Sequence, residues 1–393
     1  MMIVEFVLGT MIALLAIPVL VLLVQVIASL LPSKHHHSIK NLEDCSIAVI
    51  IPAHNESLGI AVTLQSILPQ LKSNDRLIVV ADNCTDDTAN AAQALGATVI
   101  VRENKTLRGK GYALDFGLQS LNNNPPKIVI IIDADCTIAK DGISLLAQNC
   151  IAFQRPVQAL YLMTSSVNTG LKSKIAEFAW VVKNQVRPLG FKKLDLPCQL
   201  MGTGMAFLWE DIKKIKLASG HIAEDMKMGV DLCREKKAPL FLPEVLVKSY
   251  FPNDQHGAKN QRTRWEHGHL GLIISDAPAL FVEAIKTRNI QMLGMTFDLI
   301  VPPLAILSLM IGAVSILSLI VHLIMPINGL ILATGLVLLA LTIAILAAWA
   351  FFGRHIITLN QLCYAPIYAL IKIPMYIKFF INRQVEWVRA KRD

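Results

Sequence analysis

The stretch KIVIIIDADC, residues 127–136, joins a run of branched apolar side chains to two acidic residues that follow it directly. Such a run is typical of a strand that is buried on both faces, as in a parallel sheet covered by helices. Asp133 and Asp135 are two positions apart, so in an extended backbone both carboxylates can face one ligand. The stretch therefore predicts a buried strand that ends at a candidate site.

The same alternation of apolar run and helical segment surrounds this stretch between about Cys45 and Ser249. The other runs are CSIAVIIP, RLIVVA and ATVIV, and each is followed by a helical pattern such as SLGIAVTLQSILPQL. This order predicts an α/β fold with a mainly parallel sheet covered on both faces. Ligands of such sheets bind beyond the carboxyl ends of the strands. The polar residues that follow the first two runs are His54, Asn55, Glu56, Asp82 and Asn83.

Beyond Arg155 the alternation loosens, and we expect this half to supply the grooves and loops of an acceptor site. The predicted elements are a strand over VQALYLMTSS, a helix over about 172–186, a loop with Pro188 and Pro197, a helix over about 224–235 and a strand near 244–250.

Three long apolar runs flank the polar region, and 54% of the chain is hydrophobic. Residues 3–31, 297–321 and 327–352 are each long enough to cross a hydrocarbon core of about 30 Å. The first run lacks a basic leader and a cleavage site, which favours an uncleaved anchor over a signal peptide. The link HLIMPIN between the other two carries no Lys or Arg, which is typical of a tight hairpin on the far side of the membrane.

The ends of these runs that adjoin the polar region carry positive charge. The residues concerned are Lys34, Lys40, Lys286, Arg288 and Arg354. By the positive-inside rule, the polar middle is expected to be cytosolic, in an integral protein of the plasma (inner) membrane. Residues 354–393 mix aromatic and apolar residues with lysines and arginines, which predicts amphipathic segments in the interface, with a kinked fourth span as the alternative.

These patterns divide the chain into five expected parts. They are an anchor over 1–33, a cytosolic domain over 45–255, an interface helix region over 256–294, a transmembrane hairpin over 295–353 and an amphipathic interface segment over 354–393.

The overall charge indicates the kind of partner. The 37 Lys and Arg outnumber the 29 Asp and Glu, which fits a domain that lies against anionic membrane lipids and holds an anionic ligand. Because the basic residues are dispersed and the chain is anchored, a nucleic-acid partner is not expected. The seven cysteines show no CxxC pair, so we expect reduced thiols and no zinc site.

The acidic residues at the strand ends suit a metal and a nucleotide. Hard oxygen ligands such as Asp133 and Asp135 favour Mg²⁺ or Mn²⁺ that also holds substrate phosphates, although such a pair can be no more than a turn. Asp82 can accept hydrogen bonds from a base or ribose, whereas Asp86 is expected to cap the following helix. In LRGKGYAL, Lys110 lies at a helix start that favours anions, and the segment matches neither GxxxxGK[ST] nor GxGxxG.

Two further segments carry candidate catalytic residues, each with a plainer alternative. HIAEDMKMG places Glu224 and Asp225 at a helix start, where a carboxylate can act as a general base or can simply stabilise the helix dipole. QRTRW, residues 261–265, is either a basic patch beside the membrane or part of an active site.

Taken in order, VIIPAHNES, VVADNCTDDT, LRGKGYAL, IIDADC, AED and QRTRW, followed by paired apolar runs, resemble the membrane-bound family 2 glycosyltransferases. The family includes cellulose, chitin and hyaluronan synthases and ceramide glucosyltransferases, and the resemblance covers about Ile47 to the third apolar run. It implies a GT-A domain, which is a Rossmann-like nucleotide-sugar-binding fold, and inverting transfer from a nucleotide sugar, usually a UDP-sugar.

The resemblance also implies a role for each matching residue. Asp82 corresponds to the acid that reads the base, Asp133 and Asp135 to the DxD motif that binds the diphosphate through the metal, and Asp225 to the base. Lys110 is expected to bind the nucleotide sugar, and Glu224 is expected to be catalytic with Asp225. Gln261, Arg264 and Trp265 match QxxRW, where Gln261 and Arg264 contact the donor, Trp265 contacts the acceptor, and Arg262 and Thr263 face elsewhere. Two positions depart from the family pattern. Ala223 stands where the family has Thr, which leaves the carboxylate of Asp225 intact. ADNC stands where the family commonly has DDGS, so one acid remains where many relatives have two, and the details of nucleobase recognition do not carry over.

The expected function is therefore sugar transfer to a polysaccharide, oligosaccharide or glycoconjugate acceptor at the cytosolic face of the membrane. A membrane lipid is the alternative acceptor, and a non-catalytic scaffold that binds nucleotide sugar is the remaining alternative. Three spans are few for a secretion channel, so a polymerising enzyme would need interface helices or a second copy of the chain.

Overall fold

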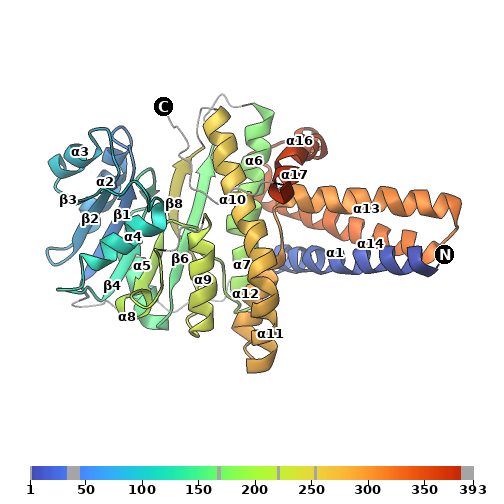
Figure 1. The fold of residues 1–393 in the computed structure, drawn as a ribbon, viewed down its shortest axis with the longest axis horizontal. Coiled ribbons are helices and arrows are strands. Elements are labelled where there is room, and N and C mark those ends of the chain that lie inside the picture. Colours follow the sequence, from blue (N-terminus) through green and yellow to red (C-terminus); the bar gives the residue numbers. More distant parts are fainter. Residues whose placement is uncertain (1, 33–44, 166–169, 219–221, 252–254, 382–393) are drawn as a thin grey trace.

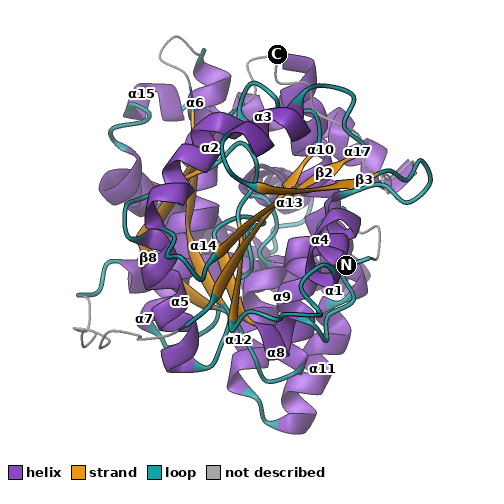
Figure 2. Cartoon of the chain, turned by 90° about the vertical axis from the view of Figure 1, so that its left-hand side faces the viewer, coloured by secondary structure: helices purple, strands orange, loops and turns teal. Residues whose placement is uncertain are grey.

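One sheet forms the centre of the computed structural model, which describes residues 2–32, 45–165, 170–218, 222–251 and 255–381. Its strands are β1 (Ile47–Ala53), β2 (Arg76–Asp82), β3 (Thr98–Arg102), β4 (Ile128–Ile131), β5 (Thr137–Ile138), β6 (Val157–Thr164), β7 (Met205–Leu208) and β8 (Leu240–Tyr250). All eight belong to the sheet, in the order β3-β2-β1-β4-β7-β6-β8-β5. Figure 2 shows its twisted strands enclosed by helices.

The sheet is parallel in its first half and mixed in its second. Strands β3, β2, β1 and β4 run parallel, whereas β7 is antiparallel to both of its neighbours, β4 and β6. β8 is parallel to β6, and β5 is antiparallel to β8. The predicted α/β fold is confirmed, but the sheet is less parallel than expected, because a short, fully buried strand shows the same apolar pattern in either direction.

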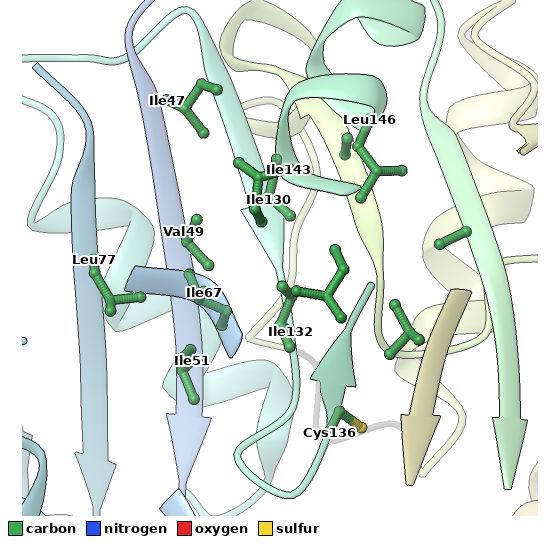
Figure 3. Packing of buried hydrophobic residues seen from close by; sticks show 14 of the residues in the cluster. Ile47, Val49, Ile51, Ile67, Leu77, Ile130, Ile132, Cys136, Ile143 and Leu146 are labelled. Carbon is green, nitrogen blue, oxygen red and sulfur yellow. The ribbon is translucent and has the colours of Figure 1, made fainter. Parts of the chain in front are cut away.

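The apolar strands are buried on both faces, as predicted. Ile47, Val49 and Ile51 of β1 contribute to one core together with Ile67 and Ile143, which come from the helices α2 (Ile60–Ile67) and α5 (Gly142–Phe153), as Figure 3 shows. The alternate residues of β1 contribute to a second core on the opposite face, with residues of α4 (Lys110–Gln119). Two covered faces explain why these strands read as continuous apolar runs. The remaining helices of this part are α3 (Thr88–Ala94), α8 (Trp209–Ile212) and α9 (Glu224–Arg234).

The helix predicted over 172–186 is longer than expected. It comprises α6 (Leu171–Val181), a π-turn η2 (Val182–Val186) and α7 (Arg187–Lys193). The prediction that Pro188 lies in a loop is wrong, because this residue occupies the first turn of α7, where proline is tolerated. Pro197 follows the end of α7, in a loop as predicted.

Three long apolar helices extend away from the sheet. Figure 1 shows α1 (Met2–Ser29), α13 (Leu304–Ile324) and α14 (Asn328–Ala348) side by side, with the N-terminus and the α13–α14 turn at the far end. This arrangement fits the expected hairpin. The second apolar run starts later than predicted, because residues 297–300 belong to α12 (Ile290–Ile300) and Pro302 and Pro303 separate this helix from α13.

Helices α10 (Gln255–Ser275), α11 (Ala277–Thr287) and α12 stand between the sheet and the three long helices in Figure 1. By length and composition, four helical segments among the described residues could cross a membrane: 2–29, 304–324, 328–353 and 359–381, or five if the bent α10–α11 pair is counted. The fourth is broken into α15 (Leu359–Leu362), α16 (Ala365–Ile371) and α17 (Ile373–Ile381). Figure 1 shows α16 and α17 at the end of α13 that faces the sheet. The expectation that these helices lie in the membrane interface stays a prediction.

Candidate active site

The acidic pair after β4 can hold a divalent cation. Asp133, Asp135 and Cys136 each offer a ligand atom, and these atoms all lie within 4.8 Å of one another. Burial raises the pKa of the Cys136 thiol to about 12, and the nearby Asp133 charge acts in the same direction, so the thiol stays protonated. The useful ligands are then the two carboxylates, which is the donor set that Mg²⁺ or Mn²⁺ prefers.

Lys110, at the start of α4, lies directly beside this pair. Its ammonium forms an ion pair with Asp133 Oδ1 and donates a hydrogen bond to the carbonyl of Gly202 at 2.7 Å. Burial alone would lower the pKa of Lys110, but the Asp133 and Glu224 carboxylates raise it, so the side chain stays cationic. The backbone of the next residue is also constrained, because a Cβ at Gly111 would lie 2.4 Å from the carbonyl oxygen of Leu217.

Replacing Lys110 with methionine should separate the binding of the cation from the binding of the nucleotide. Without the ammonium, Asp133 is free to bind Mn²⁺ more tightly in the absence of nucleotide. The affinity for a nucleoside diphosphate should fall by about tenfold, which is the effect of losing one charge-assisted contact. Mn²⁺ binding by electron paramagnetic resonance and nucleotide binding by calorimetry measure the two quantities. Lys213→Met, at an exposed lysine paired with Glu210, is the control and should change neither.

Asp225 and Glu224 form the first turn of α9, as predicted. A Cβ placed on Gly202 would lie 3.3 Å from Asp225 Oδ2 and 3.4 Å from Lys110 Nζ, so the two charged groups converge at this glycine. Gly202 has a φ of +92°, which other residues rarely adopt. Sequence reasoning assigned it no role, although the glycine pair in MGTGMAF was an available signal.

Glu224 lies near charges of both signs. Burial and the neighbouring Asp225 raise the pKa of Glu224, while Lys110 and Arg264 act in the opposite direction. Glu224 therefore holds its proton more readily than a free glutamate. The structure thus brings Asp133, Glu224 and Asp225 together around Lys110, and Arg264 of QRTRW acts on Glu224.

Asp82 ends β2 and is buried, as expected for a residue at a strand end. Its Oδ1 accepts hydrogen bonds from Arg102 Nη1 at 2.6 Å and from Asn83 Nδ2 at 2.9 Å. The guanidinium of Arg102 also lies 5.6 Å from the centre of the Tyr112 ring. Sequence reasoning missed Arg102, although an arginine at the end of the neighbouring apolar run was a usable signal.

Asp86 contacts the first turn of α3, although the N-cap residue of this helix is Asp87 and not Asp86 as predicted. Its carboxylate accepts hydrogen bonds from the backbone N–H of Thr88 at 3.1 Å and from that of Ser57, also at 3.1 Å. Burial alone would raise the pKa of Asp86, but the hydrogen bonds from Thr88 and Ser57 lower it to about 2. This residue therefore has a structural role in joining two loops.

The QRTRW segment lies within α10 and presents different side chains to different neighbours. Gln261 is buried, one turn before Arg264 and Trp265. The charge of Arg264 acts on Glu224, and its Nε is buried with no hydrogen-bond partner among the described residues. The Trp265 ring lies against Trp180 of α6, with centroids 4.9 Å apart. Arg264 therefore lies near the acidic cluster, by which we mean Asp133, Asp135, Glu224 and Asp225, whereas Trp265 packs against α6.

A cavity of about 360 Å³ opens beside Trp265, where α6, α10, α13, α14 and α16 meet. Its lining is mostly apolar and includes Ile175, Phe178, Val301, Leu304, Ile345 and Leu362. From α10 it receives Arg262, Trp265, Glu266 and His269, which share one helical face by their spacing. The prediction that Arg262 faces elsewhere is therefore wrong: it lines the cavity with Trp265 and donates a hydrogen bond to Tyr368 Oη at 3.1 Å.

Comparisons with known proteins agree with this arrangement. A model described as glycosyl transferase family 2 matches residues 48–157, and one described as glycosyl transferase family group 2 matches residues 128–368, which is more than half of the chain. The solved mannosyltransferase PcManGT from Pyrobaculum calidifontis, in complex with GDP-Man and Mn²⁺, superposes with a TM-score of 0.54. The match covers 94% of this chain and all of that one at 16% identity, so it supports the predicted GT-A fold alone.

Two curated relatives are similar over part of their length. The probable glycosyltransferase YdaM of Bacillus subtilis is 25% identical over 243 residues, which are 58% of this chain and 56% of the relative. The 4,4'-diaponeurosporenoate glycosyltransferase of Staphylococcus aureus is 34% identical over 108 residues, which are 27% of this chain and 28% of the relative. The matches thus span about half of the first relative and about a quarter of the second.

Proposed function

This chain belongs to the family 2 glycosyltransferases, and we propose that it transfers a sugar, with inversion, from a nucleotide sugar to a lipid acceptor. One observation carries the choice of acceptor: the apolar cavity beside Trp265 lies where the sheet domain meets the long apolar helices. A membrane lipid can place its chain in such a cavity and its polar end near the acidic cluster. A glycan acceptor, which the sequence favours, would need walls that are more polar than this mostly apolar lining.

Asp225 is the proposed general base. It lies beside Lys110 at Gly202, in the first turn of a helix that holds its backbone in place. In the proposed reaction it accepts the proton of the acceptor hydroxyl as that oxygen attacks the anomeric carbon, while the bond to the diphosphate breaks on the opposite face.

The leaving diphosphate carries negative charge that the site must stabilise. Lys110 and Arg264 are the proposed cationic partners, and the buried Nε of Arg264 is available to a ligand. A divalent cation held by Asp133 and Asp135 would supply further positive charge to the diphosphate when bound. Asp82, with Arg102 as its partner, is proposed to contact the nucleoside.

The proposed cellular setting follows from the long helices. With 2–29, 304–324 and 328–353 in the membrane, the sheet domain lies at one face only, because both the N-terminus and the α13–α14 turn are at the far end. The positive charges near the sheet indicate the cytosolic face of the plasma membrane. Transfer would then use a cytosolic nucleotide sugar and a lipid of the inner leaflet.

The test is to incubate the purified protein with a panel of UDP- and GDP-sugars, Mn²⁺ or Mg²⁺ and a total lipid extract. We expect nucleoside diphosphate release and a lipid product whose mass increases by one sugar residue. A ladder of glycan products would instead support a polysaccharide acceptor. Absence of release with every donor, acceptor and metal combination would contradict transferase activity, and a scaffold that binds nucleotide sugar would then be favoured.

A further inference from the structure

Lys183 lies in the π-turn η2 and lines the apolar cavity. Its ammonium lies 5.4 Å from the centre of the Trp180 ring, and Trp180 in turn contacts Trp265. Wide turns of this kind are rare in helices and occur frequently at functional sites, because they move side chains out of the regular helical register. Lys183 is thus a cation at such a turn that lies among mostly apolar walls.

The cavity lining carries more positive than negative charge. Among the described residues, its Lys and Arg side chains are Lys183, Arg187, Arg262 and Lys372. Arg187 is paired with Asp298 at 2.9 Å, and Lys372 is paired with Glu266. Within the described part of the chain, no carboxylate forms an ion pair with Lys183. A half-buried ammonium among mostly apolar walls is unfavourable unless it is neutralised, which an anionic ligand can do.

The surroundings of Lys183 also connect the cavity to the candidate base. Burial lowers the pKa of Lys183, and the charge of Arg187 acts in the same direction, while the carboxylates of Asp225 and Glu266 act in the opposite direction. Lys183 is thus close enough to Asp225 to be affected by its charge, and it opens into the cavity at the same time.

We propose that the cavity binds an amphiphile with an anionic group, either a carboxylate or a phosphate, and that Lys183 is the counter-ion of this group. This proposal rests on the proposed function, because it treats the cavity as the acceptor site. It goes further by stating that the acceptor carries a negative charge. The anionic group serves recognition and is separate from the hydroxyl whose proton Asp225 accepts. Lys183 is then a specificity-determining residue.

A binding experiment tests this without donor or turnover. The probes are chain-brominated amphiphiles that share one chain and carry a carboxylate, a phosphate or an uncharged hydroxyl group, since bromine quenches tryptophan fluorescence on contact. In the wild-type protein, the anionic probes should bind about tenfold more tightly than the neutral one. The quenching should diminish in Trp265→Phe, which locates the probe in the cavity.

Two variants of Lys183 distinguish charge from structure. Lys183→Met should lose the preference for anionic probes but keep its binding of the neutral probe, which also shows that the variant is folded. Lys183→Arg should retain the preference, as should Lys172→Met, at an exposed lysine of α6. Equal affinity of the wild type for all three probes would overturn the proposal, as would a preference that persists in Lys183→Met.

Inorganic phosphate separates a lipid from a free anion. It should not displace the bromine-labelled phosphate, because the chain contributes to affinity, and displacement at matched concentration would overturn the amphiphile assignment. Because only binding is measured, a failure here leaves sugar transfer intact. Conversely, absence of sugar transfer would contradict the proposed function and leave the binding result standing.

Discussion

Replacing Asp225 with asparagine should lower the turnover number for sugar transfer by about a thousandfold, which is within the usual range for losing a general base. The amide is nearly the same size as the carboxylate, so it keeps the shape of the site beside Gly202 but cannot accept the proton. The Michaelis constant for the nucleotide sugar should change little, because donor binding depends mainly on other groups. Steady-state kinetics with the donor and acceptor identified from the panel measure both quantities.

Two further variants show whether the loss of turnover comes from removing the general base. Asp231→Asn alters a carboxylate on the same helix that pairs with Lys227 and Arg234, and it should keep near-wild-type turnover. Glu224→Gln should reduce turnover less than Asp225→Asn. Undiminished transfer by Asp225→Asn would refute the assignment, and a larger loss in Glu224→Gln would give the role to the neighbouring residue.

Replacing Gly190 with alanine should destabilise the junction between α1 and α7 by about 3 kcal/mol, the upper part of the usual range for overpacking. A Cβ at this position would lie 1.8 Å from the carbonyl oxygen of Gln25, so the two helices would have to separate. Separation would also strain the buried hydrogen bonds that join Gln25, Arg187 and Asp298. Thermal unfolding in detergent should show a melting temperature lower by several degrees.

The matched control is a helical glycine that has no close neighbour, in one of the long apolar helices. Gly312 of α13 faces open space, with no neighbouring side chain within 4 Å of the position that a Cβ would take. Gly312→Ala should therefore leave the melting temperature unchanged or raise it slightly. Equal melting temperatures for Gly190→Ala and the wild type would show that α1 and α7 can move apart at little cost. The close approach at Gly190 would then not be what joins α1 to α7.

The order of residues along the chain was sufficient to predict the α/β fold and the collection of acidic residues at the strand ends. This follows from local rules: buried strands read as apolar runs, and parallel strands end at the same edge of a sheet. The same rules predict α9 with its two acids and the long apolar helices. Residue spacing makes Asp133 and Asp135 candidates, whereas Asp225 and Arg264 gain their place from the resemblance to a known family, and all four roles stay predictions.

Other features depend on segments that are far apart in the chain. Gly202 meets Lys110 across 92 positions, and Gln25 meets Asp298 across 273. No local pattern reports such a contact, because side-chain spacing specifies which face of an element a residue occupies but not what packs against that face. The direction of β7 and the helical place of Pro188 escaped prediction for a related reason, since neighbouring elements decide between backbone patterns that look alike in sequence.

The residue types therefore determine the chemistry that the proposed donor site could perform, since carboxylates and cations keep their properties wherever the chain places them. The proposed acceptor site depends on tertiary structure. Its cavity forms where α6, α10, α13, α14 and α16 meet, and Lys183 of η2 is one of the cationic side chains in its lining. QRTRW lies between the acidic cluster and the apolar cavity because distant helices pack together there, and no single segment of the sequence encodes that packing.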